Sequence, residues 1–293
     1  MMETQPNKET IGVIGLGLMG TALTERLLGH GYRVAVWNRT REKAAPLLGR
    51  GAVWSDNPMA GCQRAILSLY NTEAVEQVLG QMQGGLHEGL IILDTTTGEP
   101  IQTAALGARL ATQGVRYLDA PISGSSEQTR RGEATVIVGG DRQTFEACAD
   151  LWPVMGAKVF HVGACGSAAK MKLISNLVLG LNRAALAEGL AFAEALGVPP
   201  AAALEVMAGS NAYSRAMDAK GRKMVEHDFT VQARLSQHLK DVRLMIEAAE
   251  AAGMKLPLTD THRRLMEQAE AAGLGDLDNS AIIEVLRKAQ PGP

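Results

Sequence analysis

The chain has 293 residues, enough for two domains of ordinary size, and 46% of them are hydrophobic, which supports well-packed cores. A formal net charge of −2 provides neither a basic surface for nucleic acid nor a polybasic segment for a membrane. The three cysteines, Cys62, Cys148 and Cys165, form no CxxC pair, so neither a disulfide framework nor a zinc site is predicted. We therefore expect reduced thiols, no metal and a cytoplasmic location.

The N-terminal segment MMETQPNKET is polar and lacks the apolar core of a secretory signal. The longest apolar stretch, at about 168–196, is interrupted by charged and amide side chains: Lys170, Lys172, Asn176, Asn182, Arg183, Glu188 and Glu194. These are too many polar groups for a membrane span. The stretch instead predicts a long helix buried in protein.

Between residues 11 and 160, short β-branched runs alternate with helical patterns. The predicted strands are 11–15, 32–37, 64–69, 90–94, 115–120, 134–139 and 157–162. Such alternation is typical of an α/β fold in which a parallel, doubly wound sheet carries helices on both faces.

After about Gly166 the strand signals stop. Helices are predicted at 167–196, 200–208, 233–252, 258–272 and 279–288. The sequence thus predicts a first domain of residues 1–164 and an all-helical second domain of residues 165–293. Because open α/β sheets bind ligands beyond the carboxyl ends of their strands, we expect the reaction site between the two domains.

A glycine-rich motif follows the first predicted strand and opens a helix over 21–28. Its six residues are Gly15, Leu16, Gly17, Leu18, Met19 and Gly20. Gly15 permits a tight turn, Gly17 lets backbone N–H groups approach a pyrophosphate, and Gly20 lets the helix pack against the strand. The strand–turn–helix context predicts a Rossmann dinucleotide site, and a glycine-rich turn without a ligand is the alternative.

The second predicted strand ends at Asn38, where a chain that binds NAD usually places an acid for the ribose 2′-hydroxyl. A 2′-phosphate meets no repulsion from an amide. Arg39 and Arg41 can pair with that phosphate, and Thr40 can donate a hydrogen bond to it. NADP(H) is therefore predicted over NAD(H), with a solvated basic turn as the alternative.

A polar turn, Ser123-Gly124-Ser125, follows the strand that ends near Leu118. Its hydroxyls and unhindered N–H groups suit a carboxylate without any arginine. An ordinary turn or helix cap is the alternative.

Two lysines, Lys170 and Lys172, open the long helix. Lys172 and Asn176 are one turn apart and share a face, whereas Lys170 points elsewhere. Apolar neighbours surround Lys172 in the sequence: Met171, Leu173, Ile174, Leu177, Val178 and Leu179. We expect this setting to lower the pKa of Lys172, which suits a general acid near neutrality. A lysine that reaches solvent from the helix end is the alternative.

Taken together, the motifs resemble the β-hydroxyacid dehydrogenase family, which includes 3-hydroxyisobutyrate dehydrogenases and glyoxylate/succinic semialdehyde reductases. The resemblance spans nearly the whole chain and keeps the family's order. It is carried by Gly15–Gly20, Asp94–Thr97, Asp119–Gly124, Gly163–Gly166, Lys172–Asn176 and Lys240-Asp241.

The resemblance implies a role for each matching residue. Lys172 takes the place of the general acid/base, Asn176 that of its partner, and Ser123 and Gly124 those of the substrate-carboxylate contacts. Thr97 matches a hydroxyl beside the nicotinamide, with a helix N-cap as the alternative. Lys240 and Asp241 match a pair that helps close the site, with an ordinary solvated pair as the alternative. We expect Leu235, Leu239, Val242, Ile246 and Ala249 to form the buried stripe of that helix.

Three positions depart from the family pattern. Ala168 replaces a glycine of many members, and Ser125 resembles the glyoxylate/succinic semialdehyde reductase branch. That branch tends to have phenylalanine where this chain has Ala233, so a roomier substrate pocket is implied.

The resemblance implies hydride transfer between NADP(H) and a small carboxylate-bearing substrate. An imine reductase is one alternative, although the Lys172–Asn176 pair speaks against it. A catalytically silent NADP(H)-binding protein is the other. The apolar breadth of the helix over 168–196 predicts a homodimer or homotetramer.

Overall fold

The computed structural model describes residues 9–288, so most of the N-terminal segment predicted not to be a signal lies outside the described residues. The chain forms two compact units, one up to Lys172 and the other from Leu173. The division falls within helix α8 (Ser167–Ala195), and the boundary expected after residue 164 lies just before this helix begins.

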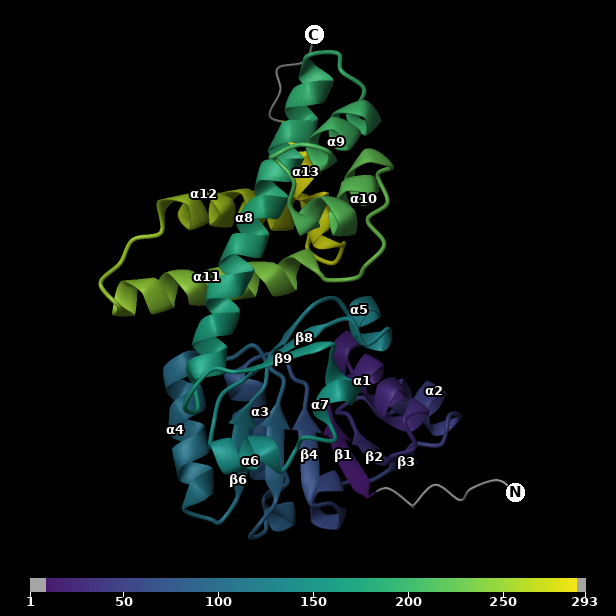
Figure 1. Cartoon of the computed structure of the whole chain (residues 1–293), viewed down its shortest axis with the longest axis vertical. Helices are drawn as coiled ribbons and strands as arrows, with labels where there is room; N and C mark the ends of the chain where they lie inside the picture. Colours follow the sequence, from purple (N-terminus) through teal and green to yellow (C-terminus); the bar gives the residue numbers. More distant parts are fainter. Residues whose placement is uncertain (1–8, 289–293) are drawn as a thin grey trace. The chain divides into compact units, whose positions relative to one another are not determined.

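The first unit contains the predicted parallel sheet, whose strand order is β3-β2-β1-β4-β5-β6 (Figure 1). The strands are β1 (Thr10–Ile14), β2 (Arg33–Trp37), β3 (Val53–Trp54), β4 (Arg64–Leu67), β5 (Ile91–Asp94) and β6 (Arg116–Asp119). All five neighbouring pairs are parallel, which confirms the doubly wound α/β fold. The strand order reverses its direction between β1 and β4, where such folds bind their ligand.

Helices cover both faces of this sheet because strand side chains alternate between two apolar cores. Ile91 and Leu93 of β5 face the first core, where α1 (Leu18–Gly29), α2 (Ala45–Leu48) and α7 (Trp152–Met155) pack. Ile92 faces the second core, where α3 (Thr72–Gln81) and α4 (Pro100–Ala111) pack.

The two last predicted strands form a separate three-stranded sheet. It consists of β7 (Ile122–Ser123), β8 (Thr135–Val138) and β9 (Lys158–His161), with β7 antiparallel to β8. Neither β3 nor β7 was predicted, since two residues are too short to show an alternating pattern. Between these strands lie α5 (Ser126–Arg130) and α6 (Arg142–Glu146), and three 3₁₀ turns occur earlier, at Arg41–Ala44, Pro58–Gly61 and Gln83–Gly85.

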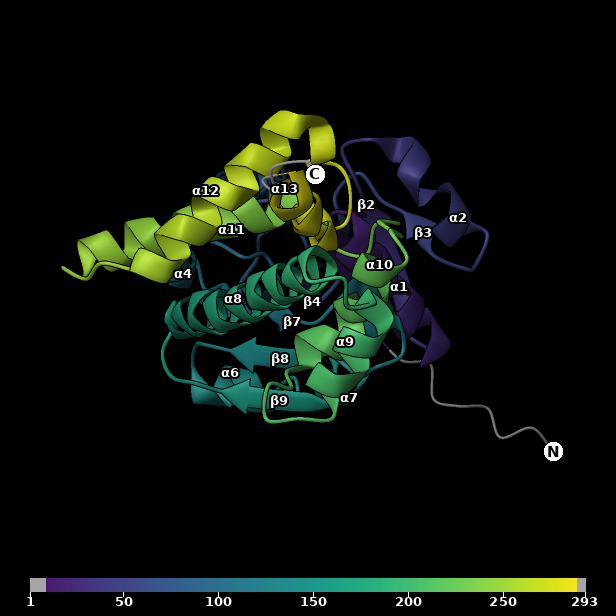
Figure 2. The same cartoon turned by 90° about the horizontal axis from the view of Figure 1, so that it is seen from above.

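The second unit is helical, as predicted, apart from one isolated bridge between Arg234 and Asp278 in its described part. After α8 come α9 (Pro200–Ala208), the π turn η4 (Met217–Gly221), α10 (Arg222–Val225), α11 (Leu235–Ala251) and α12 (Pro257–Ala269). The π turn η5 (Glu270–Leu274), the 3₁₀ turn η6 (Asn279–Ile282) and α13 (Ile283–Lys288) complete it. Helices α11 and α12 lie side by side (Figures 1 and 2).

The buried stripe of α11 differs in part from the prediction. Leu235, Leu239 and Val242 are buried as expected, but Ile246 and Ala249 are only half-buried because the last turns of α11 are less completely covered. The buried face instead includes His238, Asp241 and Met245. Among the helices of residues 9–288, none has the length and apolarity needed to cross a membrane.

Candidate active site

The glycine-rich motif forms the turn between β1 and α1, and its three glycines differ in what surrounds them. Gly15 has a φ of 97°, and a Cβ there would lie 2.3 Å from the Ser68 carbonyl oxygen. A Cβ on Gly20 would lie 1.8 Å from the carbonyl oxygen of Gly15. Around Gly17, however, a Cβ would meet no atom within 4 Å. Gly15 and Gly20 are therefore required by the fold, whereas Gly17 leaves open space that a ligand can fill.

The first turn of α1 begins at this open position. Gly17 is the N-cap residue and provides no side-chain hydrogen bond to the turn, whose first residues are Leu18 and Met19. Uncapped N–H groups at a helix N-terminus bind phosphate groups well, and the helix dipole favours negative charge there. The turn is also anchored from outside, since Thr129 Oγ1 donates to Met19 Sδ at 3.2 Å. These residues fit the pyrophosphate of a dinucleotide.

Asn38 links the end of β2 to the glycine turn. Its Oδ1 accepts from the Leu16 N–H at 2.9 Å, and its Nδ2 donates to the Thr40 carbonyl at 2.8 Å. A carboxylate cannot make the second bond, because it has no donor. Arg39 and Thr40 lie exposed just beyond, while the Arg41 guanidinium stacks 5.0 Å from the centre of the Trp54 ring.

Thr97 follows β5 in a segment whose neighbouring threonines bind backbone. Thr95 Oγ1 donates to the Leu67 carbonyl at 2.8 Å, and Thr96 Oγ1 accepts from the Leu69 N–H at 3.1 Å. The N-cap of α4 is Glu99, whose carboxylate accepts from two N–H groups of the first turn. Thr97 is therefore not the cap of this helix.

The polar turn Ser123-Gly124-Ser125 lies between β7 and α5. Gly124 has a φ of 151°, and a Cβ there would press on the Ala134 side chain at 3.1 Å. Ser125 is the N-cap of α5 in a capping box with Gln128. The cap uses one lone pair of the Ser125 hydroxyl, whose hydrogen can still donate. Ser123 is half-buried at the end of β7.

Lys172 lies against this turn. Its Nζ donates to the Ile122 carbonyl at 2.7 Å, and only 7% of the residue is exposed, whereas Lys170 is exposed. The structure thus brings an amine and the Ser123-Gly124 turn together within the first unit, although 50 residues of sequence separate Ile122 from Lys172. The alternative, in which Lys172 reaches solvent from the helix end, is therefore wrong.

The sequence-based reason for the burial of Lys172 was partly wrong. Most of its apolar neighbours point outward: Met171, Ile174, Val178 and Leu179 are 41–57% exposed. Successive helical residues turn by about 100°, so neighbours in sequence need not share an environment. Lys172 instead lies on the buried face of α8, as does Leu173.

Asp119, at the end of β6, holds the first turn of α8; it was included in a sequence motif but was given no role there. Its Oδ1 accepts from the Gly166 N–H at 3.0 Å and its Oδ2 from the Ala169 N–H at 2.9 Å. Burial raises the pKa of this carboxyl, and its hydrogen bonds to the helix N–H groups oppose that effect. Asp119 therefore fixes the helical turn that precedes Lys172.

The second unit brings together the other predicted residues. Asn176 Nδ2 donates to Asp241 Oδ2 at 3.1 Å, and Lys240 Nζ lies 3.0 Å from Asp241 Oδ1. The side chains of Lys240 and Asp241 are only 14% and 8% exposed, so the two do not form an ordinary solvated pair. The carboxylate orients the Asn176 amide, which lies one turn beyond Lys172 on the continuous helix α8.

A glycine turn at the point where the strand order reverses, together with a buried lysine at a polar turn, defines a dinucleotide-binding oxidoreductase. In residues 9–288, no group of three or more His, Cys, Asp or Glu side chains is placed to hold a metal ion. The family model for the NAD binding domain of 6-phosphogluconate dehydrogenase matches residues 10–163. A second model, NAD-binding of NADP-dependent 3-hydroxyisobutyrate dehydrogenase, matches residues 166–286. The chain belongs to the β-hydroxyacid dehydrogenase family.

Two curated relatives are similar over nearly the whole chain. Glyoxylate/succinic semialdehyde reductase 2, chloroplastic, of Arabidopsis thaliana is 30% identical over 287 residues, which cover 96% of this chain and 80% of the relative. The 2-(hydroxymethyl)glutarate dehydrogenase of Eubacterium barkeri is 32% identical over 282 residues, which cover 94% of each chain. These relatives support activity as an NAD(P)-dependent hydroxyacid dehydrogenase or semialdehyde reductase.

Solved structures agree with this assignment. The Mycobacterium tuberculosis 3-hydroxyisobutyrate dehydrogenase with L-serine has a TM-score of 0.86 at 25% identity, covering 96% of this chain and 99% of that one. Psf3 in complex with NADP+ and 2-OPP also has a TM-score of 0.86, at 26% identity, covering 94% of this chain and 99% of that one. An imine reductase from Pseudomonas sp. has a TM-score of 0.67 at 23% identity over 96% of this chain and all of that one, a likeness of fold alone.

Proposed function

We propose that the protein is an NADP(H)-dependent enzyme that interconverts a small 3-hydroxy acid, or another hydroxy acid, and its aldehyde or keto acid. Lys172 acts as the general acid/base. The observation that carries this proposal is the bond of 2.7 Å from Lys172 Nζ to the Ile122 carbonyl, since Ile122 directly precedes the Ser123-Gly124 turn. An amine beside a carboxylate-binding turn suits proton transfer to a substrate held there.

The cofactor is held by the residues of the first unit. The N–H groups of Gly15 to Gly20 bind the pyrophosphate, and Asn38 keeps the glycine turn in place through Leu16. Arg39 and Thr40 take the 2′-phosphate at the exposed end of β2. Thr97 contributes its hydroxyl near the nicotinamide. When bound, the nicotinamide supplies or accepts the hydride.

The substrate carboxylate rests on Ser123, Gly124 and Ser125. The Gly124 backbone adopts a conformation that few other residues tolerate, which leaves its N–H unhindered. In the direction of reduction, Lys172 gives a proton from Nζ to the carbonyl oxygen; in oxidation, it takes the proton from the alcohol. Asn176, oriented by Asp241 and with Lys240 beside it, binds the same oxygen from the next turn of α8.

The two alternatives predict different behaviour. An imine reductase turns over cyclic imines and has no need of a carboxylate-binding turn. A catalytically silent NADP(H)-binding protein binds the cofactor without turnover. Such a protein has no catalytic use for the buried amine of Lys172. The likeness to a solved imine reductase concerns the fold, so only the hydroxyacid reaction uses the whole set of residues described above.

We also propose that the protein works in the cytoplasm as a homodimer or homotetramer. Ile174, Val178 and Phe192 of α8, and Leu196 directly after it, are each more than half exposed. A hollow of about 490 Å³, lined by Ala185, Glu188, Gly189 and Phe192, lies on the same helix. Exposed apolar side chains in this number are typical of a surface that another chain covers. Light scattering after size exclusion measures the oligomer mass.

The proposed function is tested with a panel of substrates. Reduction of each aldehyde or imine is measured by the oxidation of NADPH, and oxidation of an alcohol by the reduction of NADP+. Succinic semialdehyde, glyoxylate and methylmalonate semialdehyde represent carboxylate-bearing aldehydes, and butanal replaces the carboxylate of succinic semialdehyde with a methyl group. A cyclic imine and, in the direction of oxidation, 2-(hydroxymethyl)glutarate complete the panel. We expect turnover of one or more acids and little of butanal or the imine.

Ser123→Ala sharpens this test. Loss of one hydrogen bond to a charged group costs about 1.5–3 kcal/mol, so kcat/KM for the best acid should fall roughly ten- to a hundredfold. The value for butanal should barely change. Equal losses for both aldehydes, or preferred turnover of the imine, would contradict the proposed carboxylate site.

A further inference from the structure

The side chain of Arg41 is held by an aromatic ring and not by a carboxylate. Its guanidinium carbon lies 5.0 Å from the centre of the Trp54 ring, which is within the range of a cation–π contact. Arg41 is exposed and opens the 3₁₀ turn that follows β2, two residues after Arg39. Among residues 9–288, neither arginine forms an ion pair with a carboxylate.

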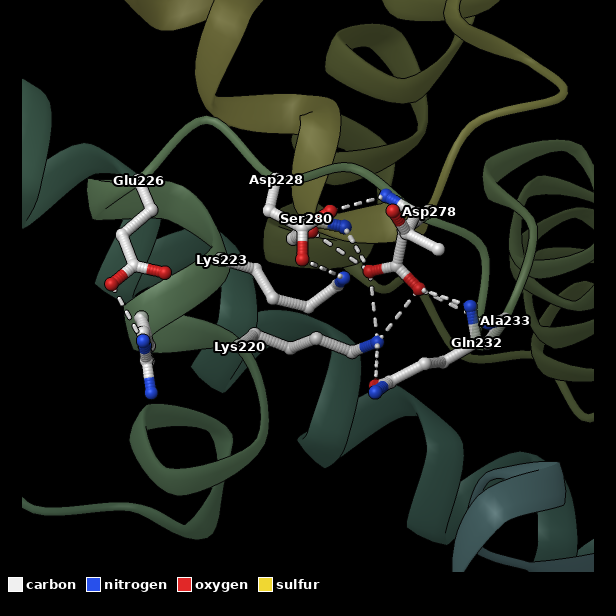
Figure 3. Close-up of polar contacts among 10 residues, drawn as sticks. Lys220, Lys223, Glu226, Asp228, Gln232, Ala233, Asp278 and Ser280 are labelled. Carbon is white, nitrogen blue, oxygen red and sulfur yellow. Dashed lines mark hydrogen bonds and ion pairs between the residues drawn. The ribbon is translucent and has the colours of Figure 1, made fainter.

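Other clusters of the chain give each cation a carboxylate, and Figure 3 shows one of them in the second unit. Lys220 Nζ lies 2.8 Å from Asp278 Oδ1. Beside it, Lys223 Nζ lies 3.3 Å from Asp228 Oδ2. A cation that is neutralised in this way has little charge left for a ligand. Arg41, in contrast, keeps its positive charge, because the partner that holds it is an uncharged ring.

The ring of Trp54 is itself fixed in three ways. Its backbone pairs with Val36 in the parallel ladder of β2 and β3, and its ring packs in part against the first core. Its Nε1 donates to Asp56 Oδ1 at 2.9 Å. The carboxyl ends of parallel strands lie at the same edge of a sheet, where such folds bind their ligand. Trp54 therefore provides a rigid surface beside the end of β2, where Asn38 lies.

A contact of this kind leaves the hydrogen-bond donors of an arginine available. The ring meets the flat face of the guanidinium, whereas the N–H groups point outward from its edge. These N–H groups form a fork that matches two oxygens of a phosphate. An exposed arginine must also lose much conformational freedom when it binds a ligand. Contact with Trp54 removes part of that freedom in advance, so Arg41 is prepared for an anion.

We propose that Trp54 is a positioning residue for the cofactor, and that its ring holds the Arg41 guanidinium where it binds the 2′-phosphate of NADP(H). This inference rests on the proposed function, which puts that phosphate at the end of β2 with Arg39 and Thr40. Thr40 is the N-cap of the 3₁₀ turn, but its hydroxyl makes no cap bond. Because NADH has no 2′-phosphate, Trp54 contributes to the choice between the two cofactors and not to dinucleotide binding in general.

Fluorescence titration with NADPH and with NADH tests the role of the ring without substrate or turnover. Trp54→Leu and Trp54→Phe both keep an apolar contact with the core, but only phenylalanine offers a ring face to the cation. An exposed cation–π contact corresponds to about a two- to fivefold change in affinity. We expect Trp54→Leu to raise the Kd for NADPH by this factor and to leave that for NADH unchanged. Trp54→Phe should keep most of the preference for NADPH.

Arg41→Ala completes a double-mutant cycle with Trp54→Leu. Loss of a hydrogen bond from a charged group should raise the Kd for NADPH roughly tenfold. Once Arg41 is removed, Trp54→Leu should have no further effect, because the ring has no guanidinium left to hold. Arg142→Ala is the matched control: Arg142 lies 5.4 Å from the centre of the Phe145 ring but is paired with Glu146. This control should change neither affinity.

Three results would overturn the proposal. Additive effects of the two substitutions would mean that the ring acts without Arg41. Equal weakening of NADPH and NADH binding by Trp54→Leu would mean that the ring contacts a part common to both cofactors, such as the adenine. An unchanged preference for NADPH in Arg41→Ala would reject the phosphate contact. The last result is available even if Trp54→Leu does not fold, because Arg41 is exposed and its removal leaves the sheet intact.

The unmodified protein separates this inference from the proposed function. If it binds NADPH no more tightly than NADH, the proposed choice of cofactor is rejected, and the inference is rejected with it. If it prefers NADPH and the preference survives in both Trp54→Leu and Arg41→Ala, only the inference is rejected. The proposed function then stands, with Arg39 and Thr40 as the residues that bind the 2′-phosphate.

Discussion

Asp119→Asn tests how the first unit fixes Lys172 without changing any group proposed to touch substrate. Both oxygens of Asp119 accept from N–H groups at the start of α8, Gly166 at 3.0 Å and Ala169 at 2.9 Å. An asparagine keeps one acceptor and turns an NH₂ group toward the other N–H, so one bond is lost and two donors face each other. Lys172 is three residues beyond Ala169, so the disturbance lies within one helical turn of its amine.

The expected loss follows from these contacts. A hydrogen bond to a charged group contributes about 1.5–3 kcal/mol. Burial of the carboxylate, which raises the pKa of Asp119, offsets the gain from a negative charge at the helix N-terminus. The free energy of unfolding should therefore fall by about 1.5–3 kcal/mol. Because a displacement of about 1 Å can cost a hundredfold in rate, we expect kcat to fall ten- to a hundredfold. The Michaelis constant for NADPH should change little, since the glycine turn is untouched.

Urea unfolding and steady-state kinetics measure the two effects. Asp141→Asn is the matched control, because Asp141 likewise accepts from an N–H at the start of a helix: it is the N-cap of α6 and accepts from the Thr144 N–H at 2.7 Å. This control should lose some stability while its kcat stays normal. The reasoning is refuted if Asp119→Asn has a normal kcat, or if the control lowers kcat as much.

Three further predictions concern the cofactor site and the sheet. Arg39→Ala should raise the Michaelis constant for NADPH roughly ten- to a hundredfold and leave that for NADH unchanged, and equal use of both cofactors by the unmodified protein would contradict it. Gly17→Ala should leave the stability of the fold unchanged but weaken cofactor binding, which NADPH fluorescence measures. Gly20→Ala should fail to fold, because its Cβ would lie 1.8 Å from a carbonyl oxygen. Burial raises the pKa of Asp94 to about 6, so its contribution to stability is complete below its ordinary pKa of 3.8 and is lost as the pH rises through 6. Asp94→Asn should therefore gain about 2.4 kcal/mol relative to the unmodified protein between pH 4 and pH 7 in urea unfolding, and a difference that does not vary with pH would refute this.

Most of the fold was predictable because its signals are local. The glycine motif, the strand patterns and the end of the strand signals near Gly166 each depend on neighbouring residues. The two-residue strands β3 and β7 were missed, since a pattern of period two needs more residues to be visible. No local pattern reveals that β8 and β9 lie outside the main sheet, where β8 pairs with β7 on one side and with β9 on the other.

The candidate site could be proposed from the sequence as a set of residues but not as a set of contacts. Lys172 and Asn176 could be selected by helical spacing, whereas the contact of Lys172 with Ile122 joins segments 50 residues apart. The same holds for Asp119, whose bonds to the start of α8 span 47 and 50 residues.

The central claim is that Lys172 transfers the proton, and the comparison of Lys172→Ala with Lys170→Ala tests it most directly. The two lysines are two residues apart on α8, but Lys172 is buried against Ile122 and Lys170 is exposed. With the best acid of the panel at saturating NADPH, Lys172→Ala should lower kcat by roughly 10²–10⁴, with the affinity for NADPH nearly unchanged. Lys170→Ala should keep most of the activity. A dispensable Lys172, or an essential Lys170, would contradict the account.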